Sequence, residues 1–313
     1  MAQNAVPAAA GQKPKKQRQS QFSGMSKALV RRETISAYLF LIPSLIFFVG
    51  FVVAPMVICL VYSFFDMGLD KSATTFVGLS NYVKMFNDPV FLKGFLNTVI
   101  IVLVAVPTVT AFSLWVSSAI YQMKAVTRSF FRCVFYLPVV TGTVAVTVVW
   151  KWMFNPYNGL LNQIFDTVGF DWLGNPKTAI WCVIMILFTT SIGQPIVLYV
   201  AALGNVDQSL VEAAQVDGAT KLQVFWKIKW PQIKPTTLYI LVITTINSFQ
   251  CFALIQLLTS GGPNHATDTI MYYIFHTVYR YQNFGYANAM GVVLAIIIAI
   301  FSAIQFKLTK TDN

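Results

Sequence analysis

The chain has 313 residues, of which 56% are hydrophobic and only 11% are charged, whereas ordinary soluble domains carry about 25% charged residues. Aromatic residues reach 15%, and the formal net charge is +11. This composition excludes an ordinary soluble domain and predicts an all-α polytopic membrane protein. A positive charge of this size can indicate a nucleic-acid partner, but the distribution of the basic residues argues against one.

Six segments contain no Asp, Glu, Lys or Arg. A helix needs about 20 mostly apolar residues to cross a bilayer core. Five segments exceed that length, and the third, with 18 residues, can extend to Phe154 at an interface. Backbone polar groups in lipid require helices or a closed barrel, and the alternating pattern of barrel strands is absent. We therefore expect six transmembrane helices in a domain of residues 34–306. The six segments are 34–65, 94–123, 133–150, 178–206, 235–267 and 281–306.

The basic residues are concentrated on one side of these segments. Residues 1–33, 124–132, 207–234 and 307–313 contain 16 of the 22 Lys and Arg residues but only five of the 11 acidic ones. Connections rich in Lys and Arg remain in the cytoplasm, so both termini are expected there. The first of these segments is expected to be a disordered basic tail, and the last a short C-terminal tail. The net charge is thus explained by membrane topology, with membrane lipid as the expected surroundings and no nucleic-acid partner.

The pattern of Cys and His residues predicts no metal site. All four cysteines lie in apolar segments and lack metal-ligand or CxxC spacing: Cys59, Cys133, Cys182 and Cys251. His265 and His276 are isolated in or beside one connection. No cofactor is expected on this chain.

A compact polar stretch, EAAQVDGATKLQVFWKIKWPQIKP, follows the fourth apolar segment. Two pairs of residues have the spacing of capping boxes, which satisfy free N–H groups where helices begin: Ser209 with Glu212, and Thr220 with Gln223. Gly218 lies between them and can turn the chain. The stretch therefore predicts two short helices joined near Gly218.

The second short helix has an apolar stripe of Leu222, Phe225 and Ile228, and Pro235 is expected to open the next membrane helix. These features fit two alternatives. The loop, residues 207–234, could be an amphipathic segment packed on the membrane, or it could be a docking surface for a partner protein.

The residue spacing favours the docking surface. Glu212-Ala213-Ala214, three residues, Gly218, nine residues and then Ile228-x-Trp230-Pro231 resembles the EAA loop of binding-protein-dependent ABC import permeases. Trp230 stands where that family usually has Leu. The resemblance implies a coupling element that docks on a separate ATPase. Its matching residues are Glu212, Ala213, Ala214, Gly218, Ile228 and Pro231.

Four further stretches are similar to carbohydrate permeases of the maltose type: residues 78–98, 136–162, 252–269 and 285–291. The resemblance implies a type I ABC importer transmembrane domain in a bacterial or archaeal cell membrane. It implies a non-catalytic subunit for uptake of a sugar or oligosaccharide. The implied partners are a second homologous permease, a dimeric ATP-binding subunit and an extracytoplasmic substrate-binding protein.

The chain lacks the motifs that would let it supply energy or bond chemistry by itself. It contains no G-x-x-x-x-G-K-[ST] phosphate loop, so ATP and magnesium are expected on the partner ATPase. It also contains neither G-x-S-x-G nor HExxH. An ion-coupled secondary transporter is the alternative, but such carriers usually have charged residues within the membrane, and the six apolar segments have none.

The fifth apolar segment is unusually polar. Thr244, Asn247, Ser248 and Cys251 are spaced so that they share one face of a helix, whereas Thr245 lies off that face. Neutral hydrogen-bonding groups of this kind suit sugar hydroxyls, although such residues also commonly hold membrane helices together. Both interpretations remain open on the residues alone.

The resemblance to maltose-type permeases adds positions from the fourth segment to the proposed sugar pathway. The complete set is Thr189, Gly193, Ile196, Thr244, Asn247, Ser248 and Cys251. The absence of Lys and Arg within the membrane segments favours an uncharged solute over an anion, because an anion would need a countercharge. An anionic solute such as glycerol phosphate is the alternative substrate.

Overall fold

The computed structural model describes residues 27–70 and 74–309, with side chains for 34–70 and 74–308. Most of the two predicted tails, 1–33 and 307–313, lies outside the described residues. The chain divides into two compact units, Met1–Ile58 and Cys59–Asn313.

The first unit consists of continuous helix where it is described. Helix α1 (Lys27–Phe48) passes through a π-helical turn (Val49–Val53) into α2 (Ala54–Tyr62), which extends into the second unit. The stretch Thr34–Tyr62 is long and apolar enough to cross a membrane, in agreement with the first predicted segment. Its large apolar side chains are exposed in this chain, and Phe40 is 86% exposed.

After the end of α2, the second unit continues with a small antiparallel ribbon, which the all-α prediction did not include. Strand β1 (Phe65–Asp66) pairs with β2 (Thr75–Phe76), and α3 (Ser80–Asn87) follows. Asn81 donates hydrogen bonds from Nδ2 to the carbonyl oxygens of Ser63 and Phe65, both at 2.9 Å. A buried amide thus fixes the ribbon to α3, because buried polar groups require partners.

Helix α4 (Pro89–Tyr121) is the central element of this unit. Asp88 caps its start by accepting a hydrogen bond from the N–H of Val90 at 2.9 Å, and Pro89 occupies the first turn, where its missing N–H costs nothing. The described helices that pack against α4 include α8 (Ala179–Ser191), α9 (Gly193–Gly204), α12 (Trp230–Phe249) and α14 (Ile270–Tyr279).

The third and fourth apolar segments both contain a bend. Helix α5 (Ala125–Thr141) and α6 (Thr143–Met153) meet at 97°, at Gly142, whose φ of +83° favours glycine. The helix expected over 133–150 is therefore interrupted at Gly142, although the bent pair could still form one span. Short α7 (Leu160–Ile164) follows, and then α8 and α9 form a second pair, bent by 40°.

The fifth segment, 235–267, is also not one helix. Two short helices, α10 (Gln208–Val216) and α11 (Lys221–Val224), lead through a π-helical turn (Phe225–Lys229) into α12. Pro235 therefore lies inside α12 instead of opening it, and Pro231 occupies the first turn. The helix ends at Phe249, before α13 (Ala253–Leu258).

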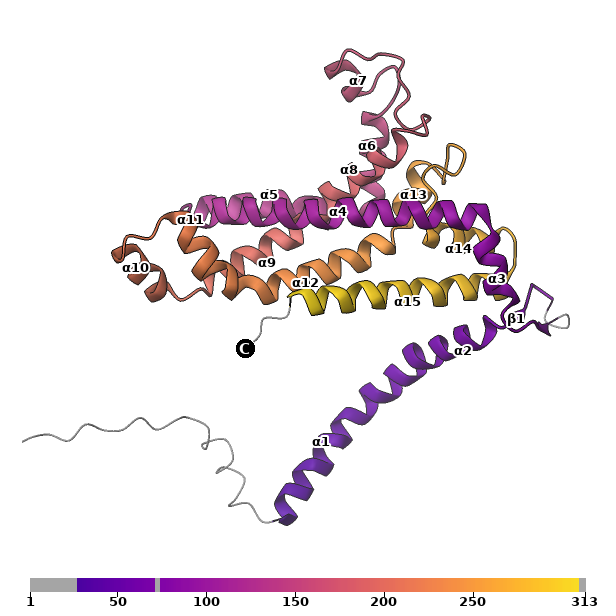
Figure 1. The fold of residues 1–313 in the computed structure, drawn as a ribbon, viewed down its shortest axis with the longest axis horizontal. Coiled ribbons are helices and arrows are strands. Elements are labelled where there is room, and N and C mark those ends of the chain that lie inside the picture. The colour runs from indigo at the N-terminus through magenta and orange to yellow at the C-terminus, as the bar shows by residue number, and fades with distance from the viewer. Residues whose placement is uncertain (1–26, 71–73, 310–313) are drawn as a thin grey trace, which may run out of the picture. The chain divides into compact units, whose positions relative to one another are not determined.

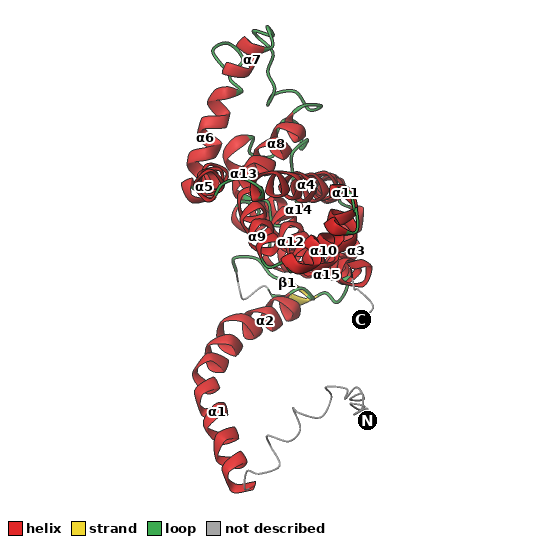
Figure 2. Ribbon diagram, turned by 90° about the vertical axis from the view of Figure 1, so that its left-hand side faces the viewer, coloured by secondary structure: helices red, strands yellow, loops and turns green. Residues whose placement is uncertain are grey.

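Figures 1 and 2 show α4, α9, α12 and the last helix, α15 (Phe284–Thr309), gathered into one bundle within the second unit, with α10 and α11 at one end of it. Within this bundle α15 packs against α12, and it also packs against α14. Among the described residues, three helices could cross a membrane by length and composition, or five if each bent pair forms one span.

Candidate functional site

The polar loop between α9 and α12 folds as two short helices joined at Gly218, as predicted. Gly218 has a φ of +79°, and its N–H donates to the carbonyl of Gln215 at 3.1 Å. The N–H of Ala219 donates to the carbonyl of Ala214 at 2.9 Å. These two bonds form a Schellman motif, which ends α10 and requires a residue that tolerates left-handed backbone.

Only one of the two predicted capping boxes forms. At α11, the Gln223 N–H donates to Thr220 Oγ1 at 3.3 Å and the Thr220 N–H donates to Gln223 Oε1 at 2.8 Å. At α10 the cap is Asp207, which accepts from the N–H and hydroxyl of Ser209 at 2.9 and 2.7 Å. The prediction of a Ser209–Glu212 box was wrong. The hydrogen bonds from Ser209 hold the pKa of Asp207 below its usual value.

Helix α10 has an inner and an outer face. On the inner side, Val211 is buried and Ala214 is half-buried, both within a core cluster that includes Val224 of α11. On the outer side, Glu212 and Ala213 are exposed. Among the predicted coupling residues, Gly218 and Pro231 are also exposed, whereas Ile228 is half-buried against the core cluster.

Large apolar side chains are exposed on this loop, outside the apolar segments. Val216 is 87% exposed and Leu222 is 68% exposed. Leu210 and Trp226 are exposed as well. We call Leu210, Ala213, Val216, Leu222 and Trp226 the outer apolar surface. The sequence analysis included Leu222 in an apolar stripe but missed Leu210, Val216 and Trp226; the steps of three between Leu210, Ala213 and Val216 were a usable helical signal.

A second candidate site is a cleft lined by residues of α5, α8, α9 and α12, with a volume of about 160 Å³. Of the seven predicted pathway residues, Thr244 and Asn247 line it. Its other lining residues are Val139, Thr190, Ser191, Gln194, Pro195, Leu198, Tyr239, Ile240 and Ile243. The described lining therefore offers hydroxyl and amide groups and no charged side chain. We call this cavity the polar cleft.

The other five predicted pathway residues do not line the polar cleft. Ile196 is fully buried in a core cluster with Val109. Ser248 is 1% exposed. Thr189 donates its hydroxyl to the Ile186 carbonyl at 2.8 Å.

Gly193 and Cys251 are likewise placed by packing. A Cβ on Gly193 would lie 2.5 Å from the carbonyl oxygen of Phe135, so this glycine permits close contact between α9 and α5. Cys251 lies beyond the end of α12, and its carbonyl accepts a hydrogen bond from Thr269 at 2.9 Å. Cys251 therefore does not lie on the helical face of Thr244, Asn247 and Ser248, where the sequence analysis had placed it.

The polar cleft includes residues that the sequence analysis did not assign to the pathway, among them Thr190, Ser191 and Tyr239. Their signal was weak, because a 40° bend separates α8 from α9 and one helical periodicity does not extend across both helices. Among the described residues, no group of three or more His, Cys, Asp or Glu side chains is arranged to hold a metal ion.

Comparison with known proteins places the chain in a family. Residues 75–310 match the family described as "Binding-protein-dependent transport system inner membrane component". The probable ABC transporter permease protein YurN of Bacillus subtilis is 33% identical over 292 residues, covering 91% of this chain and 99% of the relative. The lactose transport system permease protein LacF of Rhizobium radiobacter is 30% identical, covering 89% and 95%.

The fold also matches a solved structure. A bacterial ABC transporter involved in the import of the acidic polysaccharide alginate includes a chain that superimposes with a TM-score of 0.77 and 23% identity, covering 90% of this chain and 96% of that one. This similarity shows a shared ABC permease fold. Taken with the family match over three quarters of the sequence, it shows that the chain belongs to the binding-protein-dependent inner membrane components, the non-catalytic permease subunits of ABC importers.

Proposed function

We propose that this chain is one of two homologous permease subunits of an ATP-driven importer for a neutral sugar or oligosaccharide. It crosses the membrane six times, with both termini in the cytoplasm. The distribution of basic residues supports this orientation. The span missing from the five candidates would come from α12, whose helix has 20 residues and carries one Lys and two Pro residues near its start.

The exposed side of α10 and α11 is the proposed docking site for the ATPase subunit. The observation that carries this proposal is the outer apolar surface together with the exposed Glu212 and Gly218. Several large apolar side chains exposed together outside the membrane segments commonly mark a protein-interaction site. Beyond residues 217–219, no described atom lies within 4 Å of a Cβ placed on Gly218, so the glycine leaves open space there for the partner backbone.

Coupling would pass from this loop to the membrane helices through packing. Val211 of α10 and Val224 of α11 share a core cluster with Leu203 of α9 and Ile233 of α12. Movement of the docked loop would therefore be transmitted to α9 and α12, two of the helices that line the polar cleft. ATP binding and hydrolysis occur on the partner, and this chain changes only the access to the pathway.

The polar cleft is the proposed contribution of this chain to the substrate pathway. Its amide and hydroxyl groups can hydrogen-bond sugar hydroxyls, and its apolar residues can contact the sugar ring. Several relatives have names that specify sugars, including lactose, diacetylchitobiose and multiple sugars. A relative that is 29% identical is named for glycerol 3-phosphate. The lack of a basic residue in the described lining favours a neutral solute, since a buried anion would need a countercharge.

The proposal is tested by reconstituting the chain with its second permease, ATPase and binding protein in liposomes. Uptake of a panel of neutral oligosaccharides is measured against uptake of glycerol 3-phosphate. ATP-dependent accumulation of a neutral sugar is expected, with no accumulation of the anion. Uptake of glycerol 3-phosphate alone would contradict the substrate assignment, and uptake driven by an ion gradient without ATP would contradict the energy source.

A further inference from the structure

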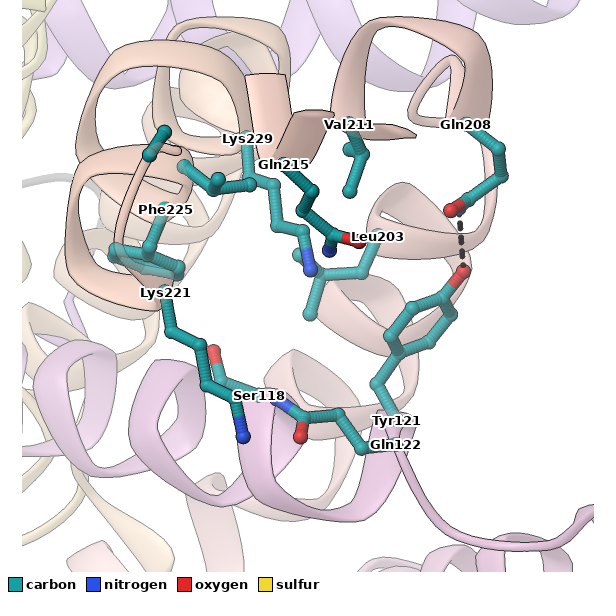
Figure 3. Close-up of a pocket in the computed structure, with 12 residues that line it drawn as sticks. Ser118, Tyr121, Gln122, Leu203, Gln208, Val211, Gln215, Lys221, Phe225 and Lys229 are labelled. Carbon is teal, nitrogen blue, oxygen red and sulfur yellow. Dashed lines mark hydrogen bonds between the residues drawn. The ribbon is translucent and has the colours of Figure 1, made fainter. Parts of the chain in front are cut away.

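A larger cavity, of about 500 Å³, lies on the inner side of the coupling loop. It is bounded by the end of α4, by α9, and by the inner sides of α10 and α11 (Figure 3). Gln208, Val211 and Gln215 line it from α10, and their spacing of three and four residues places them on one face of that helix. None of the five residues of the outer apolar surface is among its lining residues. The cavity is therefore separate from the outer apolar surface.

Two lysines line this cavity from different elements. Lys221 is the first residue of α11, and Lys229 is the last residue of the π-helical turn. Figure 3 shows the Lys229 side chain extending toward the middle of the cavity, beside Gln215, and the Lys221 side chain extending toward Ser118 and Gln122. The ammonium groups thus enter one space from two directions.

The charge of these lysines is not balanced within the described lining, which contains no acidic residue. Among the described residues, neither lysine forms an ion pair within 4.0 Å. Lys229 Nζ lies 5.9 Å from the ring centroid of Tyr121, a cation–π contact that leaves its charge in place. Two like charges beside one cavity repel each other, so an anion between them would be stabilised.

The remaining polar groups suit an anion with several oxygen atoms. The Ser118 hydroxyl and the amides of Gln122 and Gln215 line the same space and can donate hydrogen bonds. Gln208 and Tyr121 are already joined, with the amide donating to the phenol oxygen at 3.2 Å. Lysines combined with neutral donors are a common arrangement for phosphate groups. The volume falls in the usual range for small-ligand sites, about 300–1,000 Å³.

We propose that this cavity binds a phosphate-bearing anion, either the headgroup of an anionic phospholipid or a small cytosolic phosphate ester. Such a ligand would join the end of α4 to α11 and the π-helical turn, and it would fix the position of the coupling loop. This regulatory consequence rests on the proposed coupling role. Binding itself does not depend on it, so the two can fail separately.

Binding is tested on the full-length chain purified in neutral detergent, without the ATPase. Thermal stability is titrated with sodium phosphate against sodium chloride at equal ionic strength. Retention of phosphatidylglycerol against phosphatidylcholine is measured by native mass spectrometry. Lys221→Gln and Lys229→Gln should each weaken the apparent affinity at least tenfold. Lys227→Gln, an exposed change that does not line the cavity, should leave it unchanged.

The two probes separate the two ligand sources. Preferential retention of phosphatidylglycerol, without stabilisation by free phosphate, identifies a lipid headgroup. Stabilisation by free phosphate without a lipid preference identifies a soluble ester. If Lys229→Gln does not yield folded protein, the exposed Lys221→Gln carries the comparison alone. Binding of neither probe, or an equal loss in Lys227→Gln, would overturn the proposal.

Discussion

Tyr286 donates a hydrogen bond from its hydroxyl to Oδ2 of Asp88 at 2.8 Å, although the two residues are 198 positions apart. Tyr273 donates to the same oxygen at 2.7 Å, and the other carboxylate oxygen of Asp88 caps α4. One carboxylate thus joins the starts of α4 and α15 to α14. Burial raises the pKa of Asp88, but the hydrogen bonds from both tyrosines and from the backbone outweigh it, so the pKa lies below its usual value.

Tyr286→Phe should lower the free energy of unfolding by about 1.5 kcal/mol, the low end for a hydrogen bond to a charged group, because Asp88 is half-exposed. Because the folded-state pKa of Asp88 is lowered, its contribution is complete above the unfolded pKa of about 3.9 and is lost as pH falls through the folded pKa. Thermal unfolding in detergent between pH 7 and pH 3 measures both effects. Tyr281→Phe, at an exposed tyrosine, is the control, and an equal loss there would contradict the assignment.

Gly193→Val should disrupt the contact between α9 and α5, because its Cβ would lie 2.5 Å from the Phe135 carbonyl oxygen. Overpacking of this kind costs about 1–3 kcal/mol of stability. Gly204→Val lies on the same helix, where the nearest atom to the Cβ is 3.9 Å away, and it is the matched control. The measurement is the thermal midpoint of each purified variant. Equal midpoints for both would show that α9 does not need glycine at this contact.

Asn247→Leu should lower transport per assembled complex by a factor that corresponds to about 1–3 kcal/mol, if a desolvated sugar hydroxyl loses its partner. Asn247 is exposed within the chain and lines the polar cleft, so assembly and ATP binding should be unchanged. Transport must therefore be divided by the amount of assembled complex. An unchanged ratio would assign Asn247 to helix packing and not to the pathway.

Thr245 provides the contrasting case. It is buried outside the polar cleft, and its hydroxyl oxygen accepts a hydrogen bond from Gln305 Nε2 of α15 at 2.7 Å. Thr245→Val should therefore lower stability by about 1 kcal/mol, as for a lost hydrogen bond between neutral groups. It should leave transport per assembled complex unchanged. A specific transport defect with unaltered unfolding would place Thr245 in the pathway after all.

Periodicity and motif spacing were sufficient to predict the helical class, the short helices around Gly218 and the role of Thr220 and Gln223 as a cap. They failed where the helix ended or turned. Cys251 was assigned to a helical face by extrapolating the spacing of Thr244 and Asn247, but α12 ends at Phe249. At the start of α10, Asp207 and Ser209 are both good capping residues, and local sequence does not determine which one accepts the backbone N–H.

The bends caused the remaining differences. Gly142 was not distinguishable in sequence from a glycine tolerated within a membrane helix, yet its positive φ separates α5 from α6. On either side of the bend beside Gly193, Thr190 and Gln194 line the polar cleft, whereas Thr189 does not. Such changes of direction are set by tertiary packing, which the spacing of polar residues along one helix does not reveal.

The reason why residue 218 is glycine can be tested by comparing two substitutions. Asn tolerates left-handed backbone far better than Val. Gly218→Asn should therefore fold with wild-type stability, whereas Gly218→Val should be strained by about 1–2 kcal/mol. Because either side chain enters the open space around Gly218, both should reduce the ATPase activity of the assembled transporter. Normal activity in Gly218→Asn would show that only the turn conformation matters.

The central claim is that the exposed side of α10 docks on the ATPase. It is tested most directly by the amount of ATPase subunit that copurifies with the tagged chain from membranes. Glu212→Lys should abolish copurification while the chain remains in the membrane at wild-type level. Lys124→Glu inverts an exposed charge on another predicted cytoplasmic segment, and it should retain copurification. Undiminished copurification with Glu212→Lys, accompanied by wild-type transport, would contradict the assignment of this loop as the coupling site.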